Sequence, residues 1–229
     1  MTRTRERLHV VRNNISIAAK GVGRDPADVT LVAISKTFPA ERIIELRDEG
    51  ISDFGENRAQ ELEAKLLEVS NVRWHFVGHL QTNKARVVTG AVALIHSIDG
   101  IRLAEAVSRR AARLERDQDV LVEVNTSGES TKSGVVPDDA ISLARRVDGL
   151  PNVAVKGLMT IPQWPEDPED SRPAYRTMAD LGRALGGVVP EATELSMGMS
   201  RDYEVAVEEG ATIVRVGEAL FGPRTAART

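Results

Sequence analysis

One unit recurs along this chain: a short run rich in β-branched residues, a polar break, and then a longer amphipathic segment. Several of the amphipathic segments end in a glycine just before the next apolar run, which is a common end for a helix. Strands that alternate with helices form parallel sheets, because each strand must return by a crossover. The candidate strands are residues 31–35, 52–55, 73–80, 93–99, 119–125, 154–160, 192–199 and 212–222.

Eight such units favour closure into a (β/α)8 TIM barrel, which is an α/β fold. The chain has 229 residues, a length that suits one barrel domain spanning residues 1–229. A helical pattern at about residues 3–20 has no strand before it. We therefore expect an extra N-terminal helix that caps the barrel or packs alongside it. An open, doubly wound sheet is the alternative architecture.

Composition excludes several functional classes. The chain has 30 basic and 34 acidic residues and no segment that concentrates positive charge, so nucleic acid is not an expected partner. The absence of cysteine excludes disulfides, thiolate catalysis and cysteine-ligated metals. The charged N-terminus lacks the apolar stretch of a signal peptide, and no apolar run is as long as a membrane span. We expect a soluble, cytoplasmic protein with no membrane partner.

The loops after the last two strands are candidates for a phosphate site, because barrels of this kind often bind phosphate there. Gly198, Ser200 and Gly217 are spaced so that backbone amides and a hydroxyl are available at the barrel mouth. A helix that begins just after Ser200 would add its own free amides. The alternative is that these glycines only permit tight turns between strand and helix.

Lys36 follows directly after the most strand-like run of the chain, residues 31–35. It alternates with Val32 and Ile34, so it shares a strand face with two core residues. A lysine in this position is either a buried ion-pair partner or an amine made reactive by desolvation and nearby cations, which lower its pKa.

Arg215 lies within the last strand, two residues before Gly217 and on the same face. It either faces a ligand at the mouth or forms an ion pair with a carboxylate such as Glu123 or Glu56. A reactive lysine, a phosphate cradle and an arginine across the barrel together are what a pyridoxal 5′-phosphate (PLP) site requires. A phosphosugar aldolase that uses a lysine imine shares the first two features and remains an alternative.

The histidines do not indicate a metal site. His75 and His79 are four residues apart on one predicted strand, too far apart along an extended chain to bind one ion easily, and His96 is expected at the end of the following strand. We therefore predict no metal. A proline-rich, acidic segment at 163–175 is expected to form a loop near the mouth and is a candidate lid.

Seven segments together resemble the pyridoxal phosphate homeostasis protein family, the YggS/PROSC group. The resemblance extends from about residue 8 to residue 224 and implies a single-domain barrel similar to the N-terminal domain of alanine racemase, with PLP as the cofactor. The segments are LVAISKT, DFGENRAQE, WHFVGHLQTNK, VNTSGESTKSG, GLMTI, LSMGMSRD and VRVGEALFG.

The resemblance also implies roles for individual residues of a cofactor site. Lys36 matches the lysine that forms the imine, and Arg215 matches the arginine that faces the pyridine nitrogen. Ser200 and the backbone of Gly217 match the phosphate contacts. Glu218 departs from the pattern, because many relatives have Thr or Ser there and a carboxylate cannot donate a hydrogen bond to phosphate. The remaining matches are Asn57 and His79, which line the pocket, and Lys132, which lies near the mouth.

The function implied is that of a protein that holds PLP as a Lys36 imine and influences its supply to PLP-dependent apoenzymes. Vitamers of PLP are further candidate ligands. The alternative is a PLP-dependent enzyme of the racemase type. Racemisation needs a second acid or base on the opposite face of the substrate, and neither Tyr175 nor Tyr203 is an obvious candidate. We therefore predict no efficient catalysis, and we expect a monomer because the second domain of the racemases is missing.

Overall fold

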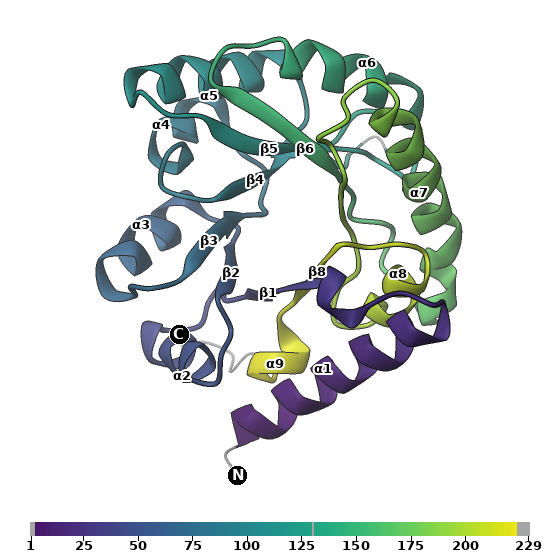
Figure 1. Cartoon of the computed structure of the whole chain (residues 1–229). Coiled ribbons are helices and arrows are strands. Elements are labelled where there is room, and N and C mark those ends of the chain that lie inside the picture. The colour runs from purple at the N-terminus through teal and green to yellow at the C-terminus, as the bar shows by residue number, and fades with distance from the viewer. Residues whose placement is uncertain (1–2, 130, 224–229) are drawn as a thin grey trace.

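Eight parallel strands form a closed barrel in the order of the sequence, and β8 pairs with β1 (Figure 1). The structure is a computed structural model that describes residues 3–129 and 131–223, so the outermost residues of the predicted 1–229 domain lie outside it. The predicted α/β barrel is confirmed, and the open sheet is excluded. The strands are β1 (Thr30–Ile34), β2 (Asp53–Glu56), β3 (Arg73–Phe76), β4 (Leu94–Ile98), β5 (Gln118–Glu123), β6 (Val153–Met159), β7 (Glu194–Ser196) and β8 (Ile213–Val216).

The helices surround the barrel on its outside, as Figure 1 shows. Among the described residues, no helix is both long and apolar enough to cross a bilayer. The α-helices are α1 (Arg3–Gly21), α2 (Ala40–Asp48), α3 (Ala59–Glu68), α4 (Ala85–Val88), α5 (Ile101–Arg113), α6 (Pro137–Asp148), α7 (Arg172–Gly186), α8 (Tyr203–Glu208) and α9 (Glu218–Phe221), and three short 3₁₀ helices are η1 (Pro26–Asp28), η2 (Thr82–Lys84) and η3 (Pro168–Ser171).

The predicted N-terminal helix is α1, and it packs alongside the barrel rather than capping it. It lies next to α8 and α9, outside β1 and β8 (Figure 1). Its buried stripe includes Leu8, Val11 and Ile15, which have the spacing of one helix face. Helix α9 spans only four residues. A helix that short covers little of the barrel wall, and α1 covers the wall beside it.

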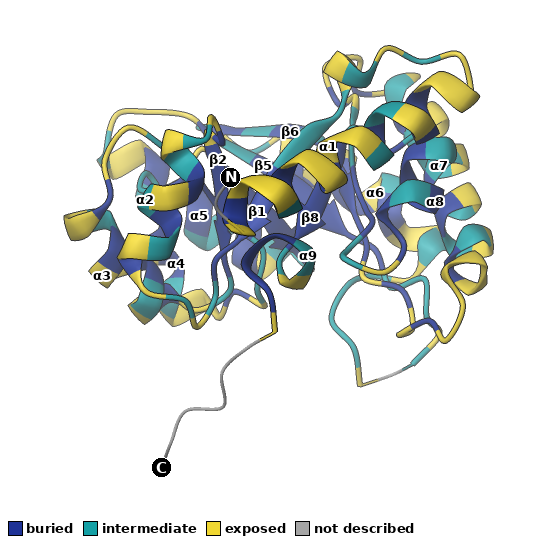
Figure 2. Ribbon diagram, turned by 90° about the horizontal axis from the view of Figure 1, so that it is seen from below, coloured by how far each residue is buried: buried dark blue, intermediate teal, exposed yellow. Residues whose placement is uncertain are grey.

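The apolar core has two parts, which Figure 2 shows as buried ribbon in the strands and on the inner faces of the helices. The larger part lies between the barrel and its surrounding helices. The smaller part fills the barrel interior with side chains from five strands, and it supports the floor beneath the barrel mouth. Its members are Val32, Ile34, Leu94, Leu121, Met159 and Ile213.

Three predicted strands are at least twice as long as the observed ones, and one of them is the strand predicted over 192–199, which is observed only at Glu194–Ser196. The strand predicted over 73–80 ends at Phe76, and a side chain at Gly78 would place its Cβ 2.2 Å from the Asn57 carbonyl oxygen. The strand predicted over 212–222 ends at Val216, and the apolar residues after it form α9. A short apolar run does not by itself distinguish a strand from a helix, which explains why the strand predicted over 212–222 was too long.

Candidate functional site

A cavity of about 490 Å³ opens at the carboxyl ends of the strands. The six residues predicted to bind a cofactor all line it, and they come from four different strand ends, those of β1, β2, β3 and β8, and from the loop after β7. Lys132 and Glu218 also line it, so the structure brings together every residue that the resemblance singled out. The six are Lys36, Asn57, His79, Ser200, Arg215 and Gly217.

The turn that carries Lys36 is held by a buried polar cluster. Lys65 from α3 donates hydrogen bonds to the Ser35 carbonyl oxygen at 2.8 Å and to Glu56 at 2.6 Å. The Ser35 hydroxyl donates to the same Glu56 oxygen at 2.7 Å. On the other side of Lys36, Thr37 adopts a left-handed φ of 68°, and its N–H donates to Glu61 at 3.0 Å. The backbone on both sides of Lys36 is therefore fixed.

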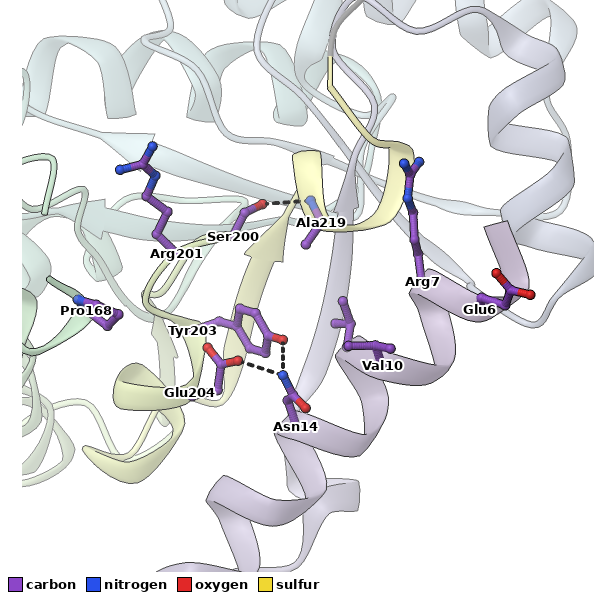
Figure 3. Close-up of a pocket in the computed structure, with 11 residues that line it drawn as sticks. Glu6, Arg7, Val10, Asn14, Pro168, Ser200, Arg201, Tyr203, Glu204 and Ala219 are labelled. Carbon is purple, nitrogen blue, oxygen red and sulfur yellow. Dashed lines mark hydrogen bonds between the residues drawn. The ribbon is translucent and has the colours of Figure 1, made fainter. Parts of the chain in front are cut away.

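Ser200 and the first turn of α9 form a polar cradle at the edge of the cavity. The Ser200 hydroxyl oxygen accepts from the N–H groups of Gly217 at 3.2 Å and Ala219 at 3.3 Å, and Figure 3 shows the second of these bonds. An oxygen that collects two backbone N–H groups marks a position suited to an anion. Glu218 lies within this turn, so its backbone, rather than its carboxylate, suits such an anion.

The loop that presents Ser200 is organised by the buried carboxylate of Asp202. This carboxylate accepts from the Met199 N–H, the Tyr175 hydroxyl and the Ser171 hydroxyl, each at 2.7 Å. Gly198 has a φ of 90°, and a Cβ there would lie 2.5 Å from the Ala206 side chain. Gly198 thus permits a tight turn against α8, which is the simpler of the two roles considered for it.

Arg215 is a buried cation in the wall of the cavity, with 4% of its surface exposed. It donates to the Ser196 hydroxyl at 2.6 Å and to the Thr160 carbonyl oxygen at 2.7 Å. Within the described residues it forms no ion pair with Glu123 or Glu56, which was the alternative considered for it. Glu56 is instead paired with Lys65.

Glu123 is a site residue that the sequence did not single out as one. It ends β5, on the side of the barrel opposite β1, and lines the cavity with 6% of its surface exposed. Its Oε2 atom is buried and has no hydrogen-bond partner among the described residues. Burial, and then the nearby charge of Asp99, raise the pKa of Glu123 to about 7, although Arg215 acts in the opposite direction. Only its place at a strand end could have indicated this residue.

The rim of the cavity is polar and partly exposed. His79 contacts the Ser133 hydroxyl at 3.1 Å and lies 3.3 Å from Asp99. Lys132 donates to the Pro162 carbonyl oxygen at 3.3 Å and pairs with Glu129 at 2.8 Å.

The segment predicted as a loop over 163–175 is helical from Pro168 onward, in η3 and then α7. An aspartate cap at Asp167 and prolines in the first turns explain this, because both begin helices well. Trp164, in the part that remains a loop, lines the cavity and stacks against the Arg201 guanidinium at 4.8 Å.

Neither tyrosine lines this cavity, and both belong to the described part of the chain. Tyr175 is fully buried and donates to Asp202, and burial raises the pKa of its hydroxyl. Tyr203 accepts from Asn14 of α1 at 3.1 Å (Figure 3). Tyr203 and Asn14 line a second cavity, of about 570 Å³, on the outer side of the Ser200 loop.

The structure separates the two histidines that were predicted to share one strand. His79 is at the rim, whereas His75 is buried inside the barrel and contacts His96. His96 lies in the middle of β4, not at its end as expected. Over residues 3–129 and 131–223, no group of three or more His, Asp or Glu side chains is arranged to hold a metal ion.

The sequence is similar to one protein family and to several known proteins. The family described as alanine racemase, N-terminal domain, matches residues 7–225. The Pyridoxal phosphate homeostasis protein of Aquifex aeolicus is 47% identical, with 96% of this chain and 97% of that protein covered. The protein of that name from Escherichia coli K12 is 40% identical, with 95% of each covered.

Solved structures with a similar fold include a protein with PLP bound and an alanine racemase. PipY of Synechococcus elongatus PCC7942, with PLP bound, superimposes with a TM-score of 0.83 at 34% identity, covering 96% of this chain and all of that one. An alanine racemase of Clostridium difficile, at 13% identity and a TM-score of 0.69, shares the fold; this chain spans 60% of it.

The fold and the cavity thus define a barrel of the alanine racemase N-terminal type. Within that class, the chain belongs to the pyridoxal phosphate homeostasis protein family.

Proposed function

We propose that this protein binds pyridoxal 5′-phosphate in the cavity, holds it as an imine with Lys36, and influences its supply to PLP-dependent enzymes. One observation carries the proposal: Lys36, the Ser200 cradle and the buried Arg215 line a single cavity. The names of the relatives and the PLP bound to the Synechococcus protein support it.

The residues present fit this cofactor. A cavity of about 490 Å³ is of the size that holds small cofactors. PLP supplies an aldehyde that condenses with a primary amine and releases water. Lys36 is the proposed amine, and the Ser200 hydroxyl with the N–H groups of Gly217 and Ala219 is the proposed phosphate site. Arg215 is the proposed partner of the ring nitrogen, and Asn57 and His79 line the remaining wall.

A carrier is favoured over an enzyme because the usual second acid–base group of a racemase is missing from the cavity. Tyr175 and Tyr203 are held elsewhere, by Asp202 and Asn14. An arginine at the ring nitrogen leaves that nitrogen unprotonated, which makes the ring a weaker electron sink. The proposal includes a cytoplasmic monomer whose partners are PLP, its vitamers and PLP-dependent apoenzymes.

One observation favours the alternative, an enzyme that acts on amino acids. Glu123 is a buried carboxyl with a pKa of about 7 on the side of the cavity opposite Lys36, and such a group can take up or release a proton near neutral pH.

Absorbance titration with PLP tests the binding proposal. The wild type is expected to develop the visible band of a lysine imine, and Lys36→Ala is expected to lose it. Lys156→Ala is the matched control, because Lys156 lies on β6 outside the cavity. A wild type without the band contradicts both PLP functions.

Incubation of the PLP-loaded protein with amino acids in deuterated water then distinguishes a carrier from a PLP-dependent enzyme. A carrier leaves the α-proton in place, whereas α-proton exchange at enzyme-like rates supports the alternative.

A further inference from the structure

A continuous row of buried hydrogen bonds runs through the barrel from the cavity toward its opposite end. Arg215 contacts Ser196 at 2.6 Å, and Ser196 contacts His96 Nδ1 at 2.8 Å. His96 Nε2 lies 2.9 Å from His75 Nδ1, and His75 Nε2 lies 2.9 Å from Asp53 Oδ1. The five side chains come from β8, β7, β4, β3 and β2, and all are buried.

The far end of the row is close to solvent. Asp53 is the first residue of β2, so it lies at the amino-terminal end of the barrel, away from the mouth. It also accepts from Arg73 Nε at 2.8 Å and from Ser52, and the Arg73 side chain is 62% exposed. The charged groups that contact the row are therefore Arg215 at one end and Asp53 with Arg73 at the other.

The chemistry of the two ends determines the direction of every bond in between. A guanidinium only donates, so Ser196 accepts from Arg215. Its own proton then goes to His96 Nδ1, which is the other hydrogen-bond contact of this buried hydroxyl among the described residues. His96 must then carry its proton on Nε2 and donate to His75 Nδ1. His75 in turn carries its proton on Nε2 and donates to the Asp53 carboxylate. With both imidazoles in the neutral form, each has one possible tautomer.

The titration behaviour of the groups agrees with this direction. Burial alone would raise the pKa of Asp53, but hydrogen bonds from His75, Ser52 and Arg73 lower it to about 2. Burial is the largest of the causes that lower the pKa of His96. Asp53 is thus the charged acceptor and His96 a neutral link.

We infer that His75 and His96 are positioning residues of the cofactor site, which act through Ser196 to orient Arg215 and connect it to Asp53 at the opposite end of the barrel. The part of this inference that concerns the cofactor rests on the proposed function. His75 does not line the cavity, whereas Arg215 does. Because all five groups are linked, a substitution at His75 is expected to change the orientation of the Arg215 side chain.

The tautomers can be measured without any ligand. The chain has four histidines, so ¹⁵N-labelled histidine in the apo protein gives a spectrum simple enough to assign with His9→Gln and His79→Gln. The inference predicts Nε2–H, with unprotonated Nδ1, for both His75 and His96 at pH 8. An Nδ1–H tautomer at either residue overturns it.

Ser196→Ala breaks the row with little change in volume. Without the Ser196 hydroxyl, His96 is expected to populate the Nδ1–H tautomer as well as the Nε2–H tautomer. PLP binding is expected to weaken at least about tenfold, since a hydrogen bond to a charged group is lost. Ser108→Ala is the matched control, because Ser108 is also buried and loses one bond of 2.7 Å, to the Pro151 carbonyl oxygen outside the barrel interior. Equal spectra and equal affinity for Ser196→Ala and the wild type contradict the inference.

Two variants of His75 separate positioning from simple packing. The amide of His75→Gln can accept and donate as the neutral imidazole does, so it is expected to retain most of the affinity for PLP. His75→Leu fills the space but breaks the row, and it is expected to weaken binding about tenfold. Equal affinities for the two overturn the inference. If the wild type binds no PLP, the proposed function fails, and the tautomer spectra still decide the inference.

Discussion

Lys65 donates a 2.6 Å hydrogen bond to Glu56, and the two form a buried ion pair beside the turn that carries Lys36. The same ammonium group donates to the Ser35 carbonyl oxygen, one residue before Lys36. A lysine from α3 therefore holds the backbone from which the proposed imine lysine projects, which links the stability of the fold to the geometry of the site.

Replacing Lys65 with Met tests this link. It leaves Glu56 buried without its cation, and the other Glu56 oxygen already lacks a partner among the described residues. The expected loss is about 3 kcal/mol in the free energy of unfolding, measured with urea. Arg183→Ala removes an exposed ion pair with Asp180 and is expected to cost less than about 0.5 kcal/mol. Similar losses in the two variants would show that the buried pair does not stabilise this turn.

Asp53 predicts a loss of stability in acid. Its pKa is about 2 in the folded protein and 3.8 ordinarily, so the folded state favours the charged form. That stabilisation is complete above about pH 4, disappears as the pH falls toward 2, and amounts to about 2 kcal/mol. The stability difference between wild type and Asp53→Asn should therefore shrink from pH 6 to pH 2.5. With exposed Asp48→Asn as control, a difference that stays constant with pH speaks against the lowered pKa.

Glu123 predicts the opposite pH dependence. Its pKa rises from 4.5 to about 7 on folding, so the folded protein binds its proton more tightly than the unfolded chain does. The free energy of unfolding should fall as the pH rises from 4.5 to 7, by up to about 3 kcal/mol from this group. Glu123→Gln removes this penalty and should gain stability relative to wild type between pH 4.5 and pH 8. Exposed Glu63→Gln should show no such gain, and equal behaviour of the two variants rejects the assignment.

Trp164 provides an optical test of the cavity. It is 62% exposed and lines the cavity, whereas Trp74, the other tryptophan of the chain, is buried at 4% and does not. PLP binding is expected to quench tryptophan emission, and Trp164→Phe is expected to remove most of the quenching. Quenching that persists in Trp164→Phe and disappears in Trp74→Phe would place the ligand away from this mouth.

The fold and much of the site could be predicted because they depend on local patterns. The alternation of Val32 and Ile34 predicts β1, with Lys36 in the turn that follows it, and eight repeats of one unit predict the closed barrel. Arg215 was found for the same reason, because its spacing from Gly217 places both on one face.

The remaining features depend on contacts between residues far apart in the sequence. Glu56 offered no sign that Lys65 rather than Arg215 would be its partner, since α3 must first dock. The row through His75 and His96 requires five strands in correct register, and no spacing along the chain encodes it. Glu123 was uninformative for a related reason: an unpartnered oxygen is a property of its packed surroundings.

The central claim is that Lys36 holds the cofactor covalently, and borohydride reduction followed by peptide mass spectrometry tests it most directly. Reduction converts an imine to a stable amine, so the phosphopyridoxyl group stays on the lysine that carried it. The expected result is a single modified peptide containing Lys36, absent from Lys36→Ala and unchanged in Lys156→Ala. An unmodified Lys36, or label on Lys132 or other lysines in its place, would contradict the account.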